Sequence, residues 1–187
     1  MDFKKDLLIV DTELTGLDAE KHEIIQLAAV LLDRKTLKEK AFFDSYVRPT
    51  KWANRDPEAM KVNKLGLPLL EKAPDLKKVI RSFAKKFHPK KVLLVAYVGW
   101  VDKRFLLKAF EKTGVKWAYD YHYLDIWSLA YASLAKKGQL RNPKEFVGFN
   151  MENLLKKYKI SLPGSHHDAL FDCRAEAEIL RRVIKGF

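Results

Sequence analysis

The chain has little cysteine, few glycines and prolines, and no long hydrophobic run. Its single cysteine, Cys173, excludes an internal disulfide and a cysteine-rich zinc site. No apolar stretch reaches the length of about 20 residues that a transmembrane helix needs, and the charged start of the chain does not have the pattern of a signal peptide. We therefore expect a protein of the reducing cytoplasm that does not associate with membranes.

The chain also has fewer acidic than basic residues, with 24 Asp and Glu compared with 36 Lys and Arg. The resulting net charge of +12 and pI near 9.6 favour binding to polyanions, of which nucleic acid is the commonest. Lysine outnumbers arginine, which favours contact with phosphates over reading of bases. Solubility and thermal stability are alternative reasons for the lysines, and composition alone does not choose between them.

The pattern of apolar residues predicts one α/β domain over residues 1–187. Hydrophobic residues make up 48% of the chain, and no repeat or linker divides it. Three consecutive apolar runs at the start predict a β-meander, and the later alternation of helices and strands predicts a mixed sheet with helices on both faces. Strands are predicted at 7–13, 23–33, 37–47, 92–97 and 121–125, helices at 74–87, 102–114, 126–136, 151–158 and 168–185, short helical pieces in a loop at 51–70, and a basic loop at 136–144.

Two carboxylates lie at the end of the first predicted strand. Asp11 and Glu13 are two residues apart, so along a strand their side chains point to the same side. Like charges at such range repel unless a cation lies between them, and a hard divalent metal ion is the usual cation. An Asp-x-Glu on its own is more often a capping residue beside a solvated one, so the rest of the chain has to decide.

Further polar residues are predicted to reach the same edge of the sheet. Asp102 follows the fourth predicted strand through a short loop, at the carboxyl end where open α/β sheets bind ligands. Asp172 lies on the last predicted helix, off its apolar stripe, and His167 comes just before that helix. On its own, each of these residues has an ordinary structural interpretation. An aspartate at a helix start normally caps the helix, and a single histidine is normally a surface residue.

Taken together, these residues resemble the motifs of the DEDDh family of 3′-to-5′ exonucleases, which includes the proofreading epsilon subunit of bacterial DNA polymerase III, oligoribonuclease and ribonuclease T. The resemblance covers nearly the whole chain and implies a ribonuclease H-like fold, with a mixed five-stranded sheet that starts with the three-strand meander. It also implies hydrolysis of phosphodiester bonds at the 3′ end of single-stranded DNA or RNA. The motifs are Asp11-x-Glu13, Asp102 in Asp-x-x-Phe-Leu, and His167-x-Ala169-x-x-Asp172.

The resemblance implies a two-metal reaction with a histidine base. Such hydrolysis uses two divalent ions about 3.5–4 Å apart to activate water and neutralise charge on the phosphate. Asp11, Glu13 and Asp172 would hold the first ion. Asp11 would also bridge to the second ion, and Asp102 would reach it through coordinated waters. Mg²⁺ or Mn²⁺ is expected, because the ligands are hard oxygens.

His167 would take the proton from the attacking water, a task suited to a side chain with a reference pKa near 6.5. The adjacent His166 keeps this assignment open. Asp125 also ends a predicted strand, and we expect it to support the site from outside the metal ligands.

The substrate is less clearly defined than the chemistry. Tyr97 and Val98 occupy positions where the family often has His-Asn, and Leu14 stands where it often has Thr. Phe105 could stack on a base or simply pack in the core, and its helical spacing favours packing. The substrate-binding residues that the resemblance implies are Thr12, Leu14, Leu17 and Phe105.

Two alternatives to a long-strand exonuclease remain. One is an oligoribonuclease-like enzyme, or another metal phosphohydrolase, that acts on short oligonucleotides or small molecules. The other is an inactive nucleic-acid-binding accessory subunit. The exonuclease and the oligonucleotide hypotheses both expect the single-stranded 3′ end of a nucleic acid as the partner. Assembly with a polymerase or as a homodimer would come in addition.

Overall fold

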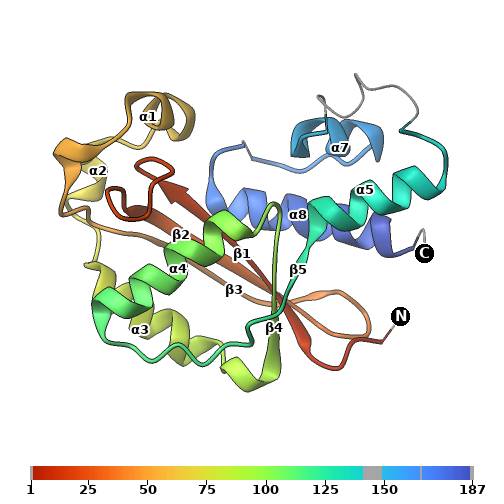
Figure 1. The fold of residues 1–187 in the computed structure, drawn as a ribbon, viewed down its shortest axis with the longest axis horizontal. Helices are drawn as coiled ribbons and strands as arrows, with labels where there is room; N and C mark the ends of the chain where they lie inside the picture. The colour runs from red at the N-terminus through yellow and green to blue at the C-terminus, as the bar shows by residue number, and fades with distance from the viewer. Residues whose placement is uncertain (1, 141–148, 165, 186–187) are drawn as a thin grey trace.

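The computed structural model describes residues 2–140, 149–164 and 166–185. Its centre is one five-stranded sheet with the strand order β3-β2-β1-β4-β5 (Figure 1). The first three strands pair antiparallel as a meander, and β4 and β5 run parallel to β1. The predicted mixed sheet is therefore confirmed. The strands are β1 (Asp6–Leu14), β2 (Ile24–Leu32), β3 (Glu39–Tyr46), β4 (Val92–Ala96) and β5 (Tyr123–Asp125).

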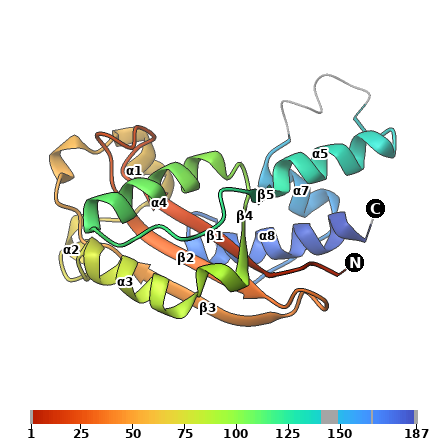
Figure 2. The same ribbon diagram turned by 60° about the horizontal axis from the view of Figure 1, so that its bottom comes forward.

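Helices cover both faces of this sheet, as the sequence predicts. Figures 1 and 2 show α5, α7 and α8 gathered on one face, while α3 and α4 lie against the other. Among the described residues, no helix combines the length and the hydropathy needed to cross a membrane. The helices are α1 (Pro57–Asn63), α2 (Leu67–Leu70), α3 (Leu76–Lys86), α4 (Trp100–Thr113), α5 (Ile126–Lys136), α7 (Met151–Lys157) and α8 (Ala169–Ile184), with short 3₁₀ turns η1 (Trp52–Asn54) and η2 (Pro89–Lys91).

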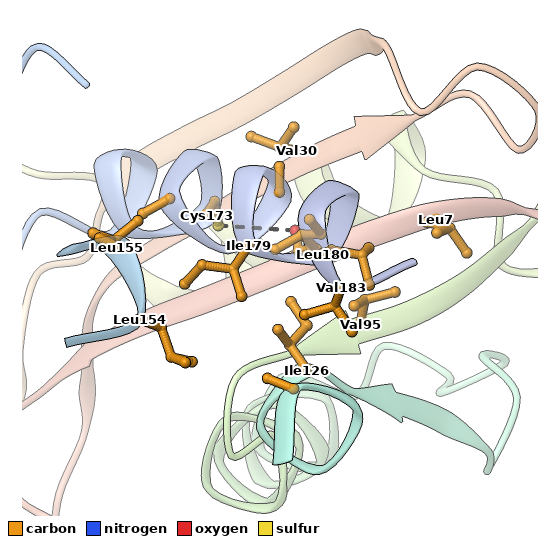
Figure 3. Packing of buried hydrophobic residues seen from close by; sticks show 14 of the residues in the cluster. Leu7, Val30, Val95, Ile126, Leu154, Leu155, Cys173, Ile179, Leu180 and Val183 are labelled. Atoms are coloured by element: carbon orange, nitrogen blue, oxygen red, sulfur yellow. Dashed lines mark hydrogen bonds between the residues drawn. The ribbon is translucent and has the colours of Figure 1, made fainter. Parts of the chain in front are cut away.

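The alternation of β1 divides the core between the two faces. Leu7 and Ile9 pack with α5, α7 and α8, whereas Leu8 and Val10 pack with α3 and α4. Because β1 is paired on both sides and covered on both faces, its residues 7–10 are all apolar. Figure 3 shows the first of these clusters, in which side chains of α8 such as Leu180 and Val183 meet Leu7 and Val95 of the sheet. The packing on both faces of β1 therefore fixes the position of the residues at its carboxyl end.

The helix that carries Asp102 begins earlier than predicted. Gly99 is the residue before α4, so Asp102 lies in the first helical turn instead of opening the helix. The physical reason is that the Asp102 carboxylate does not cap the helix, because it accepts a hydrogen bond from the side chain of Thr12 on β1. Residues 141–144 of the basic loop predicted at 136–144 lie outside the described residues, and the first residue of that loop, Lys136, still belongs to α5.

Candidate active site

The carboxyl end of β1 brings two acids to the face covered by α8. Asp11 and Glu13 continue the row of Leu7 and Ile9, and Glu13 is only 8% exposed. The Sγ of Cys173 on α8 lies 3.8 Å from the backbone oxygen of Ile9, which fixes the helix closely against this strand. The predicted common side of Asp11 and Glu13 therefore faces the start of α8.

Asp172, in the first turn of α8, lies beside both histidines. One of its carboxylate oxygens is 2.9 Å from Nδ1 of His166, and the other accepts a hydrogen bond of 3.0 Å from the backbone N–H of His167. His167 has a left-handed backbone with φ of 66°, a conformation that few residues other than glycine adopt. This turn leaves the His167 side chain exposed, while that of His166 is half-buried against Phe171.

Glu13, His167 and Asp172 form a compact group. Each offers one ligand atom, and these three atoms all lie within 4.8 Å of one another. Glu13 comes from β1, whereas His167 and Asp172 are five residues apart at the start of α8, so the fold brings the strand and this local motif together. Two carboxylates and an imidazole at this spacing are suited to a divalent cation or to a water molecule held between them.

Asp102 reaches the site from the opposite face of the sheet. The hydroxyl of Thr12 donates a hydrogen bond of 2.6 Å to the Asp102 carboxylate, and both residues are 8% exposed. This bond connects β1 to the first turn of α4. The Thr12 hydroxyl is thus engaged within the protein.

Asp125 supports the start of α4 from β5. One of its carboxylate oxygens accepts a hydrogen bond of 3.0 Å from the backbone N–H of Gly99, and the other caps α5 through the backbone N–H of Ser128 at 2.7 Å. The contact with Gly99 orients the backbone just before the helical turn that carries Asp102.

The carboxylates of the site are crowded and short of positive charge. Burial raises the pKa of Glu13 to about 7, with repulsion from Asp172 and Asp102 adding to it. Burial also raises the pKa of Asp102 to about 6 and moves the pKa values of Asp11 and Asp172 upward. In the part of the chain that the structure describes, no lysine or arginine forms an ion pair with any of these four acids. The donor set of hard oxygens therefore fits divalent cations, which would supply the missing charge.

A fifth acid, Glu176, was not identified from the sequence. It lies one turn after Asp172 on α8 and is only 1% exposed. Burial, followed by repulsion from Asp102 and Asp172, raises its pKa well above the usual value. Its position four residues after Asp172 and three after Cys173 was the available signal, because that spacing places it on the buried face of the helix.

The residues predicted to contact substrate differ in exposure. Leu17 is 69% exposed, whereas Leu14 is 8% exposed and its backbone oxygen accepts a hydrogen bond from Asn63. Phe105 is 3% exposed and belongs to the core cluster below α4. Of the two roles considered for Phe105, stacking on a base or packing in the core, its position agrees with packing. Trp100, a large aromatic that sequence reasoning overlooked, is 57% exposed two residues before Asp102.

The fold and the site together define an α/β protein with a carboxylate cluster suited to divalent cations at the carboxyl edge of its sheet. The chain belongs to the RNase_T exonuclease family, whose model matches residues 8–180. The nuclease domain of 3'hExo, a DEDDh family member bound to rAMP, superposes with a TM-score of 0.77 at 22% identity, covering 99% of this chain and 94% of that one. The resemblance to DEDDh exonucleases that the motifs predict is confirmed, as is the predicted fold.

Two curated relatives show the same likeness in sequence. Ribonuclease T of Haemophilus influenzae (strain 86-028NP) is 29% identical over 120 residues, which cover 58% of this chain and 52% of that protein. The PolC-type DNA polymerase III of Bacillus subtilis (strain 168) is 29% identical over 180 residues, which cover 95% of this chain and 11% of the polymerase. The chain therefore spans about half of the first relative's length and a small part of the second's.

Proposed function

We propose that this protein is a metal-dependent 3′-to-5′ exonuclease that removes nucleotides from the 3′ end of single-stranded DNA or RNA. The observation that carries the proposal is the meeting of Glu13, His167 and Asp172 within 4.8 Å, beside Asp11 and Asp102, in a chain of the exonuclease family. A binding module would have no use for a buried carboxylate cluster, because buried like charges cost stability.

The metal ligands in this proposal are the four acids of the motifs. Asp11, Glu13 and Asp172 would hold one Mg²⁺ or Mn²⁺, and Asp11 and Asp102 would hold a second. Bound divalent ions would supply charge neutralisation at the scissile phosphate and a lower pKa for the attacking water. Thr12 keeps Asp102 aligned, since its hydroxyl donates to that carboxylate.

His167 is the proposed general base. It accepts the proton of the attacking water while the water oxygen bonds to phosphorus and the bond from phosphorus to the leaving 3′ oxygen breaks. The products are a nucleoside 5′-monophosphate and a strand shortened by one nucleotide. His166 is already occupied by Asp172 at 2.9 Å, whereas the exposed ring of His167 lies by Glu13, which favours His167 for this role.

The substrate in the proposal is a single strand bound with little base preference. The net charge of +12 attracts its phosphates, and Leu17 acts as an apolar wedge next to the terminal nucleotide. Thr12 and Leu14 contribute through their backbone, while Phe105 only packs. Neither a polymerase complex nor a homodimer is part of the proposal.

The test is a comparison of 5′-labelled single-stranded DNA and RNA, each in a long and a very short form, with Mg²⁺, Mn²⁺ or chelator. We expect stepwise shortening that requires metal, and a steeper fall with salt for the long substrates. His167→Ala should lose about 10²–10⁴-fold in rate, the usual contribution of a general base. The matched control is the exposed histidine variant His122→Ala, which should retain full activity. Activity confined to the very short substrates would indicate the oligonucleotide enzyme, and binding without cleavage would indicate the accessory subunit.

A further inference from the structure

A pocket separate from the acid cluster lies on the face of the sheet that α3 and α4 cover. It has a volume of about 310 Å³ and lies where the start of β2, the residues after β3, the first turn of α3 and one side of α4 meet. α3 and α4 lie side by side on this face (Figure 2). None of the acids and histidines of the proposed active site lines this pocket, which we call the α3/α4 pocket.

The floor of the α3/α4 pocket is apolar and well packed. Ile24, Val47, Phe105 and Ala109 line it, and each of them is at most 4% exposed and belongs to the core cluster under α3 and α4. A concave, mostly apolar surface open to water is the usual form of a small-molecule site, and such sites begin at about 300 Å³. A flat ring would cover this floor, whereas a simple ion would leave it exposed to water.

Basic side chains surround the opening of the pocket. They come from three separate segments, which are the chain after β3, the first turn of α3 and one side of α4. With the described residues, only Lys108 forms ion pairs, and its partners Glu20 and Glu111 are themselves strongly exposed. The basic residues that line the pocket are Arg48, Lys51, Lys77, Lys108 and Lys112.

The two acids that line the pocket are bound to backbone groups. Glu23 accepts hydrogen bonds from the backbone N–H groups of Thr50 and Lys51 and from the Thr50 hydroxyl, at distances between 2.6 and 3.2 Å. Asp75 caps α3 by accepting a hydrogen bond from the backbone N–H of Lys78. Five cations and two acids leave a surplus of positive charge around the apolar floor.

We propose that the α3/α4 pocket binds one nucleotide unit, with its base on the apolar floor and its phosphate among the cations at the opening. A nucleotide combines a flat ring with a phosphate, and lysine binds phosphate as a point charge. Two sources offer this chemistry, a free nucleoside 5′-monophosphate and a nucleotide within a bound strand. The inference goes beyond the proposed function, because this binding needs neither the metal ions nor the motif acids.

The experiment follows the backbone amide signals of the isotope-labelled protein by NMR in chelator, while adenosine 5′-monophosphate or inorganic phosphate is added. We expect the monophosphate to shift the amides of Val47, Leu76 and Ala109, which line the pocket. Inorganic phosphate should shift them much less, because it has no ring to place on the floor. Shifts confined to the surroundings of Glu13 and His167, equal shifts with both additives, or no shift at all would overturn the inference and leave the proposed function intact.

Charge reversal tests the role of the cations. Lys77→Glu combined with Lys112→Glu should weaken binding of the monophosphate by about tenfold or more, because each change replaces an attraction with a repulsion. The matched control combines Lys78→Glu with Lys116→Glu, which alters the net charge equally at exposed positions that do not line the pocket. The control should bind the monophosphate as the wild type does. Equal weakening in both double variants would indicate a general effect of charge and overturn the inference.

Labelled single strands in chelator distinguish the two sources of the nucleotide. If the pocket holds part of a strand, the pocket variant should bind a long strand more weakly than the control variant does, while both should bind a dinucleotide alike. If the ligand is the free monophosphate, the two variants should bind the long strand equally. A wild type without metal-dependent cleavage would overturn the proposed function and leave this inference standing.

Discussion

The two halves of α8 are both buried against the sheet but differ in the residues that they bury. The carboxyl half buries Ile179, Leu180 and Val183, whereas the amino half buries the acids Asp172 and Glu176 among small residues such as Ala169, Cys173 and Ala175. Burying each aliphatic side chain stabilises the fold by about 1.5–3 kcal/mol, while burying carboxylates without a counter-ion costs stability. The comparison indicates that one half anchors the helix so that the other can hold charges that the fold alone would not favour.

The substitution that should distinguish the roles of the two halves most clearly neutralises an acid of the amino half. Asp172→Asn removes a metal ligand and the acceptor of the His167 backbone N–H, so we expect exonuclease activity to fall by about 1000-fold or more. The metal-free variant should melt no lower than the wild type, because it loses a repelled charge. A variant that keeps its activity would show that Asp172 is not a metal ligand. Rates on a labelled single strand and melting curves in chelator provide the measurements.

The complementary substitution shortens one apolar side chain in the carboxyl half. Leu180→Ala should lower the free energy of unfolding by about 2–5 kcal/mol, because it leaves a cavity between α8 and the sheet. Activity per folded molecule should stay near the wild-type value at a temperature where the variant is folded. Denaturant unfolding and an activity assay on the same samples test this. A loss of activity without a loss of stability would contradict the division of labour between the two halves.

The acidic half should also make stability depend on pH. Burial raises the pKa of Glu13, which faces Asp172, from 4.5 to about 7, so the folded protein binds more protons than the unfolded chain between these values. Stability of the metal-free protein should therefore fall as pH rises from about 4.5 to 7, by at most roughly 3 kcal/mol for this group. Saturating Mg²⁺ should remove the fall. Melting temperatures across this range, with and without Mg²⁺, test it, and a rising or flat profile in chelator would contradict it.

Cys173, next to Asp172 in the amino half, should matter least. Its thiol is fully buried against β1, so Cys173→Ala should cost about 1 kcal/mol of stability through lost packing. The affinity for Mn²⁺ should stay within about twofold, because a buried neutral thiol among oxygen ligands is not needed for a hard cation. Denaturant unfolding and a Mn²⁺ titration measure the two effects. Loss of metal binding would show that Cys173 helps to position the acids.

Local patterns in the sequence predicted most of the fold, because they report burial directly. The unbroken apolar run of β1 and the three-and-four spacing of α8 placed the first strand and the last helix within a residue or two. The motif residues Asp11, Glu13, Asp102 and Asp172 do converge on one edge of the sheet, although their roles stay predictions.

What the sequence did not reveal depends on contacts between distant segments. The burial of Glu176 follows from how α8 lies against the ends of β1 and β4, and a glutamate on a helix is normally solvent-exposed. The start of α4 shifted because Thr12, far away in the chain, binds Asp102. The exposure of Trp100 beside the site is likewise a property of the folded chain.

The central claim is that acids from β1, α4 and α8 form a metal centre that hydrolyses strands from the 3′ end. The most direct measurement is a time course on single strands with a nuclease-resistant linkage at either the 3′ or the 5′ terminus. We expect metal-dependent release of nucleoside 5′-monophosphates that is blocked by 3′ protection, unaffected by 5′ protection and absent in Asp172→Asn. Cleavage that starts internally or at the 5′ end, or that persists in chelator, would contradict it.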